Sequence, residues 1–378
     1  MKIAAALSTA TNLSVAMTEV VERITESLGS EGADLAFAFA SADHGVVLGR
    51  LAADLMGRGL ARHVVGCTGE SIVGDGREIE EGPALSVWVA RLPGTTIEPL
   101  RLEFTPGDRE AGATQGPGGT LLVLGDPFSF AADGWLKRIQ EVAPGVPVLG
   151  GMASASRVPG GNVLTLDGAE FSNGAVGVRL SGGVAIRALV SQGCRPIGRP
   201  LLVTKADRNL VVELGRRPAL EVFREVFEDL DDEDQERVRL GLHLGVVTNE
   251  YQESFTRGDF LVRNVVGADD AGALALTDRV RVGQTVQFHV RDAASADEDL
   301  KTLLADAPPA HGALLFSCNG RGTRLFDVPD HDVSVLREFL GDVPIAGFFA
   351  MGEIGPVGGL NYVHGFTASV ALFHEATP

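Results

Sequence analysis

The sequence predicts a mixed α/β (α+β) fold, in which repeated strand-helix-strand units form mixed sheets flanked by helices and the chain divides into two lobes. Three observations predict this fold. The length of 378 residues exceeds what one hydrophobic core usually holds. A hydrophobic content of 45% suits well-packed lobes. Short apolar runs are followed by helical stretches in a pattern that occurs three times.

Each copy of the pattern begins with an apolar run typical of a buried strand, passes through a helical stretch and reaches a second short strand that ends in glycine. The first strands are expected at residues 35–40, 121–124 and 313–317, the closing glycines are Gly66, Gly150 and Gly347, and a third strand lies around Val87, Val176 and Val370. A strand-helix-strand unit of this size is a crossover between parallel strands. Because ligands gather at the carboxyl ends of such strands, the loops opened by the three glycines are candidate binding loops.

The region between the second and third copies has a different pattern. Two strands are expected in residues 200–214 around a turn at 207–209, and a helix begins at Pro218. The acidic run at 229–236 predicts a solvated surface. Further strands are expected at 242–247, 260–266, 273–276 and 286–290, followed by a helix at 293–304. We divide the sequence into an N-terminal domain, residues 1–217, with two repeat units, and a C-terminal domain, residues 218–378, with the third.

Charge and cysteine content narrow the function classes. The net charge of −18 argues against nucleic-acid partners and anionic membrane surfaces. The three cysteines show neither a disulfide framework nor zinc-ligand spacing, so no metal site is expected. The N-terminus lacks a signal-peptide core, and no apolar run reaches the length of a membrane span. A cytoplasmic protein is therefore expected.

The most informative segment is residues 344–359, which holds five glycines, two prolines and a single charge. This composition predicts a buried loop, since glycine and proline interrupt regular structure whereas linkers are polar. The strand end at residues 316–322 is expected to form the opposite wall of one ligand site. The candidate ligand-binding residues are Cys318, Asn319, Gly320, Arg321, Gly322, Gly347, Phe348, Phe349, Gly352, Glu353, Gly355 and His364, together with Cys67 and Glu70 of the first copy.

The charged candidates have two interpretations each. Arg321 either grips a carboxylate or phosphate of the ligand or pairs with an internal acid such as Glu353. Glu353 either accepts an amine or works as an acid/base, or it holds the loop through a buried ion pair. Cys318 and Cys67 are interpreted as inert apolar residues, because a reactive thiol needs a neighbouring cation or base. His364 is interpreted as a hydrogen-bonded structural residue, and Phe348 and Phe349 as packing or pocket-lining residues.

Several longer motifs resemble those of the FIST proteins, which combine a FIST N-terminal and a FIST C-terminal domain. The matching pieces are Val65-Gly-Cys-Thr68 with Gly74-Asp-Gly76, Pro147-Val-Leu-Gly-Gly-Met-Ala153, Arg257-Gly-Asp-Phe-Leu-Val-Arg-Asn264, Leu315-Phe-Ser-Cys-Asn-Gly-Arg-Gly322, and Ala346-Gly-Phe-Phe-Ala-Met-Gly-Glu-Ile-Gly-Pro-Val-Gly358 with His364-Gly-Phe-Thr367. The resemblance implies a sensory module in signal transduction that binds small ligands such as amino acids. It carries no catalytic residues over to this chain.

The expected function is therefore a small-molecule-binding sensor without its own output domain, whose ligand is an amino acid or a related small anion and whose signalling partner is a separate protein. No recognisable catalytic motif is present, so neither an enzyme nor a bound cofactor is expected. Three alternatives stay open. The first is a haem-binding sensor with His364 or His243 as ligand, the second is an enzyme that uses Cys318 or Glu353, and the third is a scaffold whose repeats present an interaction surface.

Overall fold

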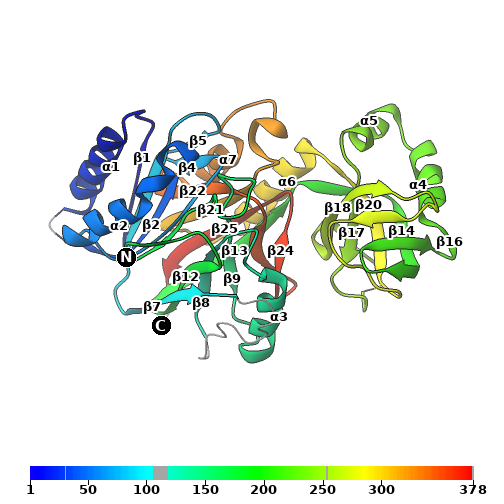
Figure 1. Ribbon diagram of the computed structural model, residues 1–378, viewed down its shortest axis with the longest axis horizontal. Coiled ribbons are helices and arrows are strands. Elements are labelled where there is room, and N and C mark those ends of the chain that lie inside the picture. The colour runs from blue at the N-terminus through cyan, green and yellow to red at the C-terminus, as the bar shows by residue number, and fades with distance from the viewer. Residues whose placement is uncertain (30, 105–117, 253, 377–378) are drawn as a thin grey trace. The chain divides into compact units, whose positions relative to one another are not determined.

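A computed structural model describes residues 1–29, 31–104, 118–252 and 254–376 (Figure 1). The described chain forms two compact units. The main unit comprises Met1–Ser191, Leu300–Val363 and the chain from Thr367 onward, and the inserted unit comprises Gln192–Asp299 with His364–Phe366. The domain boundary that we predicted between residues 217 and 218 stays a prediction. In the structure this position lies within β16 (Arg217–Pro218) of the inserted unit.

The main unit contains three six-stranded sheets with one common strand order. The first sheet consists of β1 (Lys2–Ser8), β6 (Leu85–Arg91), β2 (Ala33–Ala40), β3 (Ala61–Thr68), β10 (Leu164–Leu166) and β11 (Ala169–Phe171). The second consists of β7 (Thr95–Leu102), β12 (Ala175–Gly182), β8 (Thr120–Gly125), β9 (Val148–Met152), β23 (Glu353–Val357) and β24 (Leu360–His364). The third consists of β13 (Val184–Gln192), β25 (Thr367–Glu375), β21 (Gly312–Cys318), β22 (Ile345–Ala350), β4 (Ile72–Gly74) and β5 (Arg77–Ile79).

The predicted strand-helix-strand units form the centre of each sheet. The pairs β2/β3, β8/β9 and β21/β22 are parallel, as predicted for crossover units. The third strand of each copy, β6, β12 or β25, pairs antiparallel with the first strand of its own copy. The sequence repeat is thus a structural repeat, and the mixed α/β fold is confirmed.

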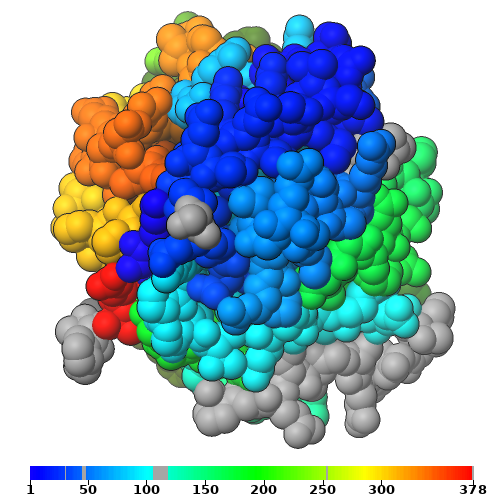
Figure 2. All heavy atoms as spheres, turned by 90° about the vertical axis from the view of Figure 1, so that its left-hand side faces the viewer, coloured from blue at the N-terminus to red at the C-terminus, as the bar shows by residue number. Residues whose placement is uncertain are grey.

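Each sheet is completed by a hairpin from another copy. The hairpin β10–β11 of the second copy adds to β3 of the first, β23–β24 of the third adds to β9 of the second, and β4–β5 of the first adds to β22 of the third. This exchange is cyclic, so the three copies are related by an approximate threefold arrangement. Figure 2 shows residues of the first copy (blue) flanked by residues of the second (green) and the third (orange and yellow).

The three hairpins also share their turns. Their two-residue loops are Asp75-Gly76, Asp167-Gly168 and Gly358-Gly359, and both residues of every loop have positive φ, between 50° and 87°. A two-residue hairpin of this kind favours Asp-Gly or Gly-Gly because an L side chain is strained there. These dipeptides were a sequence signal for hairpins that the repeat pattern alone did not reveal.

Helices cover the outer faces, and the inner faces share one core (Figure 1). The covering helices are α1 (Leu13–Leu28) and α2 (Leu48–Gly57) on the first sheet, α3 (Ala132–Val142) on the second, and α7 (His331–Leu340) with the carboxyl half of α6 (Ala293–Ala305) on the third. Short 3-10 segments occupy Ala42–Val47, Arg257–Asp259 and Gly322–Arg324. The shared core joins Phe37, Leu122 and Phe316 from the three first strands, all fully buried. Burial of such side chains is the main stabilising contribution to the unit.

The repeat glycines do not end their strands, contrary to our prediction. Gly66, Gly150 and Gly347 lie inside β3, β9 and β22, each of which continues for at least two residues. A Cβ on Gly150 or Gly347 would lie 1.8 Å from a backbone oxygen of the neighbouring parallel strand, and on Gly66 2.3 Å. These glycines therefore allow close approach of two strands, and the loops begin later.

The segment 344–359 is likewise not a loop. It forms β22 and β23, which are joined by Met351 and Gly352. Its glycines serve close packing between strands: a Cβ on Gly355 would lie 2.4 Å from the side chain of Val190. Pro356 follows the part of β23 that pairs with β9, so the ladder does not need its missing N–H.

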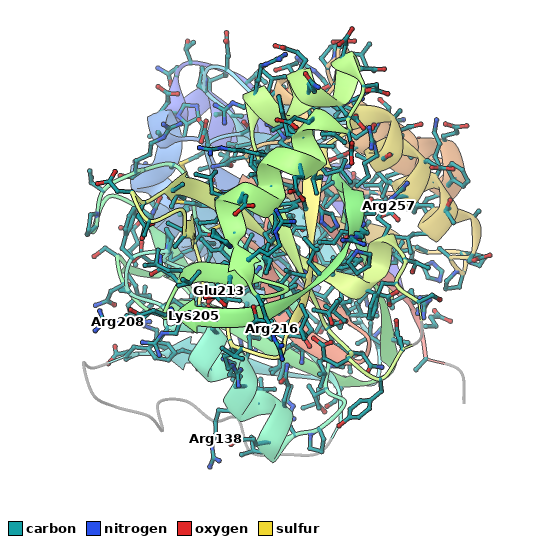
Figure 3. All side chains as sticks on the ribbon, turned by 90° about the vertical axis from the view of Figure 1, so that its right-hand side faces the viewer. Arg138, Lys205, Arg208, Glu213, Arg216 and Arg257 are labelled. Carbon is teal, nitrogen blue, oxygen red and sulfur yellow. The ribbon has the colours of Figure 1, made fainter. Side chains whose placement is uncertain are left out.

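The inserted unit is an antiparallel barrel. Its strands follow the order β14 (Cys194–Asp207), β20 (Thr285–Arg291), β17 (His243–Val247), β18 (Phe260–Ala268), β19 (Leu274–Leu276), β15 (Leu210–Leu214) and β16, and the pairing of β14 with β15 closes the barrel. The strands predicted in this region are confirmed, and so is the helix after Pro218, which is α4 (Ala219–Glu228). Figure 3 shows one flank of the barrel, where Lys205 and Glu213 of β14 and β15 form an ion pair.

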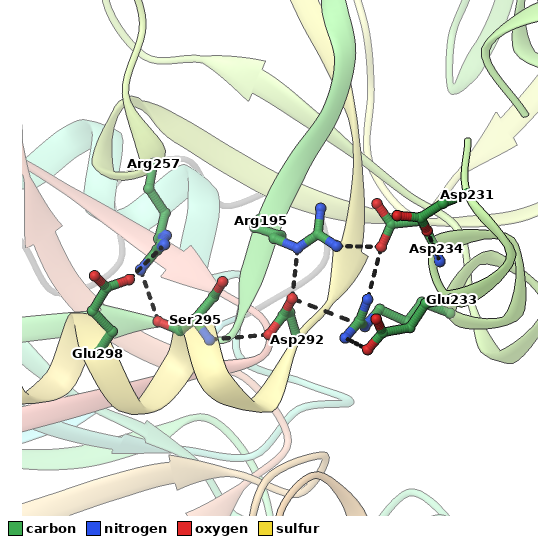
Figure 4. Close-up of polar contacts among 9 residues, drawn as sticks. Arg195, Asp231, Glu233, Asp234, Arg257, Asp292, Ser295 and Glu298 are labelled. Carbon is green, nitrogen blue, oxygen red and sulfur yellow. Dashed lines mark hydrogen bonds and ion pairs between the residues drawn. The ribbon is translucent and has the colours of Figure 1, made fainter. Parts of the chain in front are cut away.

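The acidic run at 229–236, which we interpreted as a solvated surface, also contributes to a helix and to an ion-pair network. Most of it forms the start of α5 (Asp232–Leu240), where Asp231 caps the helix by accepting a hydrogen bond from the Asp234 N–H. Asp234 and Asp292 both pair with Arg195 of β14, and Arg237 also contacts Asp234 (Figure 4). This network ties α5 to the barrel and to the residue that precedes α6.

No helix in the described ranges is both long enough and apolar enough to span a membrane.

Candidate functional site

The carboxyl ends of β3, β9 and β22 meet in what we call the strand-end ring, residues 68–70, 152–154 and 349–351. The Ser154 N–H donates to the Thr68 carbonyl at 3.0 Å, and the Met351 N–H donates to the Met152 carbonyl at 3.0 Å. The third link differs, because the Ser154 hydroxyl accepts from the Glu70 N–H at 2.8 Å and donates to the Phe349 carbonyl. The threefold arrangement is therefore broken at one place, where a side chain replaces a direct backbone contact.

A polar cluster lies beside this ring and draws one or two side chains from each copy: Glu70, Arg157, Asn319 and Arg324. Asn319 Nδ2 donates to Glu70 Oε2 at 2.9 Å, and Arg324 pairs with the other carboxylate oxygen. Arg157 lies 3.8 Å from that same oxygen. The side chain of Glu70 is 23% exposed, whereas those of Arg324 and Arg157 are 51% and 78% exposed. The cluster thus offers a carboxylate, two guanidinium groups and an amide at the surface.

Arg321 is bound to an acid that we did not predict. Its Nε and Nη2 donate to the two carboxylate oxygens of Asp332 on α7, at 2.8 and 2.7 Å, and both side chains are fully buried. Ser317 Oγ also donates to Asp332, at 2.8 Å. Burial acts to raise the pKa of the Asp332 carboxyl, but the Arg321 guanidinium outweighs it and holds that pKa below its usual range. The alternative of an Arg321–Glu353 ion pair is therefore wrong, and the internal partner is Asp332.

Glu353 is the first residue of β23 and is fully buried. One carboxyl oxygen accepts from the N–H and the hydroxyl of Thr367, at 3.2 and 2.9 Å. Burial raises the pKa of Glu353 to about 8, which the hydrogen bonds with Thr367 and with the Cys318 thiol only partly oppose. The Glu353 carboxyl is therefore predominantly neutral at pH 7. It does not need the cationic or hydrogen-bonding partner that an ionised carboxylate in this segment would require.

The other predicted residues fall into three groups. Phe348 and Phe349 are buried packing residues, and Cys67 lies in the shared core, where burial raises the pKa of its thiol well above its usual value. Gly347 and Gly355 lie within strands, Gly352 lies in the bend between β22 and β23, and Gly320 and Gly322 shape the turn after β21. His364 ends β24 and is counted with the inserted unit.

The structure thus brings together two subsets of the predicted residues. Glu70 and Asn319 form a hydrogen bond in the polar cluster, and Cys318 and Glu353 contact each other. Sequence reasoning missed Ser154, Arg157, Arg324 and Asp332. Ser154 and Arg157 follow Gly150 in the loop of the second copy, as Glu70 follows Gly66 in the first, so comparison of the loops could have found them.

A surface hollow of about 420 Å³ lies at the end of β9, where Phe130, Met152, Met351 and Val363 are among its lining residues. Three further hollows in the described structure have volumes of about 220, 520 and 470 Å³. None of these four is lined by Arg321 or Glu353. Arg321 and Glu353 are fully buried, whereas Glu70, Arg157 and Arg324 of the polar cluster are partly exposed to solvent.

Comparison with known proteins gives the same family over most of the chain. The FIST N domain profile matches residues 34–217, and the FIST C domain profile matches residues 219–356. The chain is 40% identical over 384 aligned residues to the uncharacterized protein Rv0628c of Mycobacterium tuberculosis, covering 99% of this chain and 100% of that relative. It is 44% identical over 323 residues to the uncharacterized protein Mb0898c of Mycobacterium bovis, covering 82% of each. The chain therefore belongs to the FIST family, whose domains are associated with sensing in signal transduction.

Proposed function

We propose that the protein is a sensor that binds a free amino acid, or a related small carboxylate, at the polar cluster and passes its occupancy to a separate signalling protein. One observation carries the proposal: all three structural copies supply polar side chains to this single exposed cluster, namely Glu70, Arg157, Asn319 and Arg324. A site assembled from three copies responds to any change in their relative arrangement. The site is assigned to binding, without catalysis and without a bound cofactor.

The charges of the cluster complement those of an amino acid. The Glu70 carboxylate can accept a ligand ammonium group, and the guanidinium groups of Arg324 and Arg157 can each grip a carboxylate with paired hydrogen bonds. Asn319 Oδ1 is buried and has no hydrogen-bond partner among the described residues, so it is an additional acceptor for a ligand N–H. Exposed ion pairs contribute only about 0–1 kcal/mol each, so a ligand can replace them at low cost.

The strand-end ring offers a route from the cluster to the rest of the main unit. The Glu70 N–H is bound to the Ser154 hydroxyl, and that hydroxyl is bound to the Phe349 carbonyl of β22. A ligand that shifts Glu70 would therefore shift the one side-chain link of the ring. A contact that switches between two arrangements is what a binding event needs in order to alter a distant surface, and we assign this role to the Ser154 link.

A thermal-shift screen of the common amino acids and small dicarboxylates, followed by calorimetry of any binder, tests the proposal. A ligand at 100 times its Kd should stabilise the native state by about 2.7 kcal/mol. Arg324→Ala and Glu70→Gln should each abolish this stabilisation. Arg138→Ala is the matched control, because Arg138 (labelled in Figure 3) is an exposed arginine on α3 that pairs with Glu141 and not with the Glu70 carboxylate. Absence of any stabilising ligand, or unchanged binding in Glu70→Gln, would refute the proposal.

A further inference from the structure

The three cysteines of the chain differ in their surroundings. Cys67 and Cys194 are 0% and 1% exposed and pack among other buried side chains. Cys318 is half-buried at the end of β21, where the strand breaks into the turn that leads to Arg321. Of the three cysteines, Cys318 is therefore the residue that a small solute from the solvent can approach.

Polar groups converge on the Cys318 sulfur. The Gly320 N–H donates to Sγ at 3.4 Å, and the Glu353 carboxyl lies within hydrogen-bonding reach of the thiol. The positive charge of Arg321 also acts on this sulfur. An N–H donor and a nearby cation both stabilise negative charge that develops on sulfur.

Two buried atoms in these surroundings lack protein partners. Arg321 Nη1 makes no hydrogen bond within the described residues, although its side chain is fully buried. Glu353 Oε1 likewise has no hydrogen-bond partner within the described residues, and its side chain is also fully buried. Buried polar groups are normally satisfied, so unpaired ones beside a partly accessible sulfur indicate a small polar guest.

We propose that Cys318 is a peroxide-reactive thiol, with Arg321 and Glu353 as the groups that bind and protonate the peroxide. The sulfur attacks one oxygen of hydrogen peroxide, an S–O bond forms and the O–O bond breaks. The departing hydroxide takes the proton of the Glu353 carboxyl and leaves as water, and the thiol proton restores that carboxyl. Sulfur is oxidised by two electrons to the sulfenic acid and the peroxide is reduced, so the step consumes one thiol and one peroxide.

The size of the guest follows from the packing. The four surface hollows described above are lined by other residues, and the Phe349 ring packs against Gly322 in the turn. Hydrogen peroxide has two heavy atoms and needs little more room than a water molecule. This reactivity is independent of the proposed amino-acid site, because Cys318, Arg321 and Glu353 lie outside the polar cluster.

The first experiment tests the reactivity of Cys318 in the wild-type protein. The reduced protein is exposed to hydrogen peroxide with a sulfenic-acid trap, and the three cysteine peptides are quantified by mass spectrometry over time. We expect Cys318 to be labelled at least about tenfold faster than Cys67 and Cys194, and faster than a free model thiol at the same pH. Equal rates for Cys318 and the model thiol would overturn the proposal, as would labelling of Cys67 or Cys194 at the same rate.

A second experiment distinguishes proton donation by the Glu353 carboxyl from the packing role of its side chain. Glu353→Gln keeps the shape and the hydrogen-bonding capacity of the side chain but cannot supply a proton to hydroxide. We expect Cys318 labelling to slow by at least about a hundredfold in this variant, the lower end of what a positioned general acid typically contributes. The wild-type rate should also lose its general-acid contribution as pH rises through 8, whereas the variant should show no such break. An unchanged rate and pH profile in Glu353→Gln would exclude Glu353 as the proton donor and overturn the proposal.

Discussion

Arg321 and Glu353 are buried ionisable residues whose roles depend on their neighbours in the fold, because residue type alone allows both a ligand-binding and a structural role. Arg321 was a candidate ligand anchor, yet two of its nitrogens are committed to Asp332 inside the protein. Glu353 was expected to need a counter-ion, yet burial keeps it neutral beside Thr367 and Cys318. The sequence predicted that Glu353 lies in a buried segment and that Arg321 binds either a ligand or an internal acid. It could not supply their partners, because Asp332 lies on α7 and Thr367 begins β25.

The Arg321–Asp332 pair predicts a large structural effect. Arg321→Ala should destabilise the main unit by about 3–5 kcal/mol, because it leaves the Asp332 carboxylate buried without its cation. Chemical denaturation monitored by circular dichroism would measure the loss. The double variant Arg321→Ala with Asp332→Ala should recover part of it, since no unpaired charge then remains. A single variant as stable as the wild type would show that the buried pair contributes nothing to folding.

At the scale of elements, close strand contact rather than loop formation explains the repeated glycines. The sequence repeat correctly placed a strand, a helix and a second strand in every copy. It placed the strand ends too early, because a glycine inside a strand and a glycine that ends one have the same local pattern. The distinction depends on the neighbouring strand, which lies about thirty residues away in sequence.

Two glycines on different elements give a matched test. Gly347→Ala should destabilise the protein by at least about 3 kcal/mol, because the new Cβ would lie 1.8 Å from the Leu315 oxygen and the parallel pair would have to separate. Gly134→Ala should stabilise it by about 0.5–1 kcal/mol, because Gly134 lies inside α3 with no atom within 4 Å of the new Cβ. Denaturation midpoints of the two variants would measure the destabilisation expected for Gly347→Ala and the stabilisation expected for Gly134→Ala. Similar midpoints for the two would contradict the assigned role of Gly347.

At the scale of the whole molecule, the two units differ in their buried titratable groups. The main unit buries Glu353 and Glu78, and in each case burial is the largest cause that raises the carboxyl pKa to about 8. The inserted unit buries His243 and His289, which face each other across β17 and β20. Burial lowers the pKa of both histidines to about 4. Between pH 6.5 and 4.5, a range that lies above the usual pKa of the Asp332 carboxyl, these groups should make the two units respond to pH in opposite directions.

The direction follows from comparing folded and unfolded pKa values. The two carboxyls bind protons more tightly when folded, so their contribution to the stability of the main unit is complete below pH 4.5 and is lost as pH rises towards 8. The histidines bind protons more tightly when unfolded, so the inserted unit loses stability as pH falls from 6.5 towards 4.

Hydrogen exchange resolved by peptide should show this contrast. Between pH 6.5 and 4.5, protection of β17 and β20 should fall more steeply than that of β21 and β22, after correction for the intrinsic exchange rate. His289→Phe should flatten the dependence in the barrel, because a residue that cannot titrate replaces one that does. Glu353→Gln should leave the barrel dependence unchanged and reduce the loss of main-unit protection between pH 4.5 and 8. Parallel changes in both units would contradict the assignment.

The sequence by itself determined the repeated strand-helix-strand units, most of the strands between residues 200 and 305 with the helices α4 and α6, and the family. These features depend on local periodicity and on motifs, which neighbouring residues record. Only the tertiary structure decided the exchange of hairpins between copies, the partner of Arg321 and the meeting of Glu70 with Asn319, which are 249 residues apart in the chain. Such contacts arise when sheets close around a shared core, and no local pattern specifies which edge receives which hairpin.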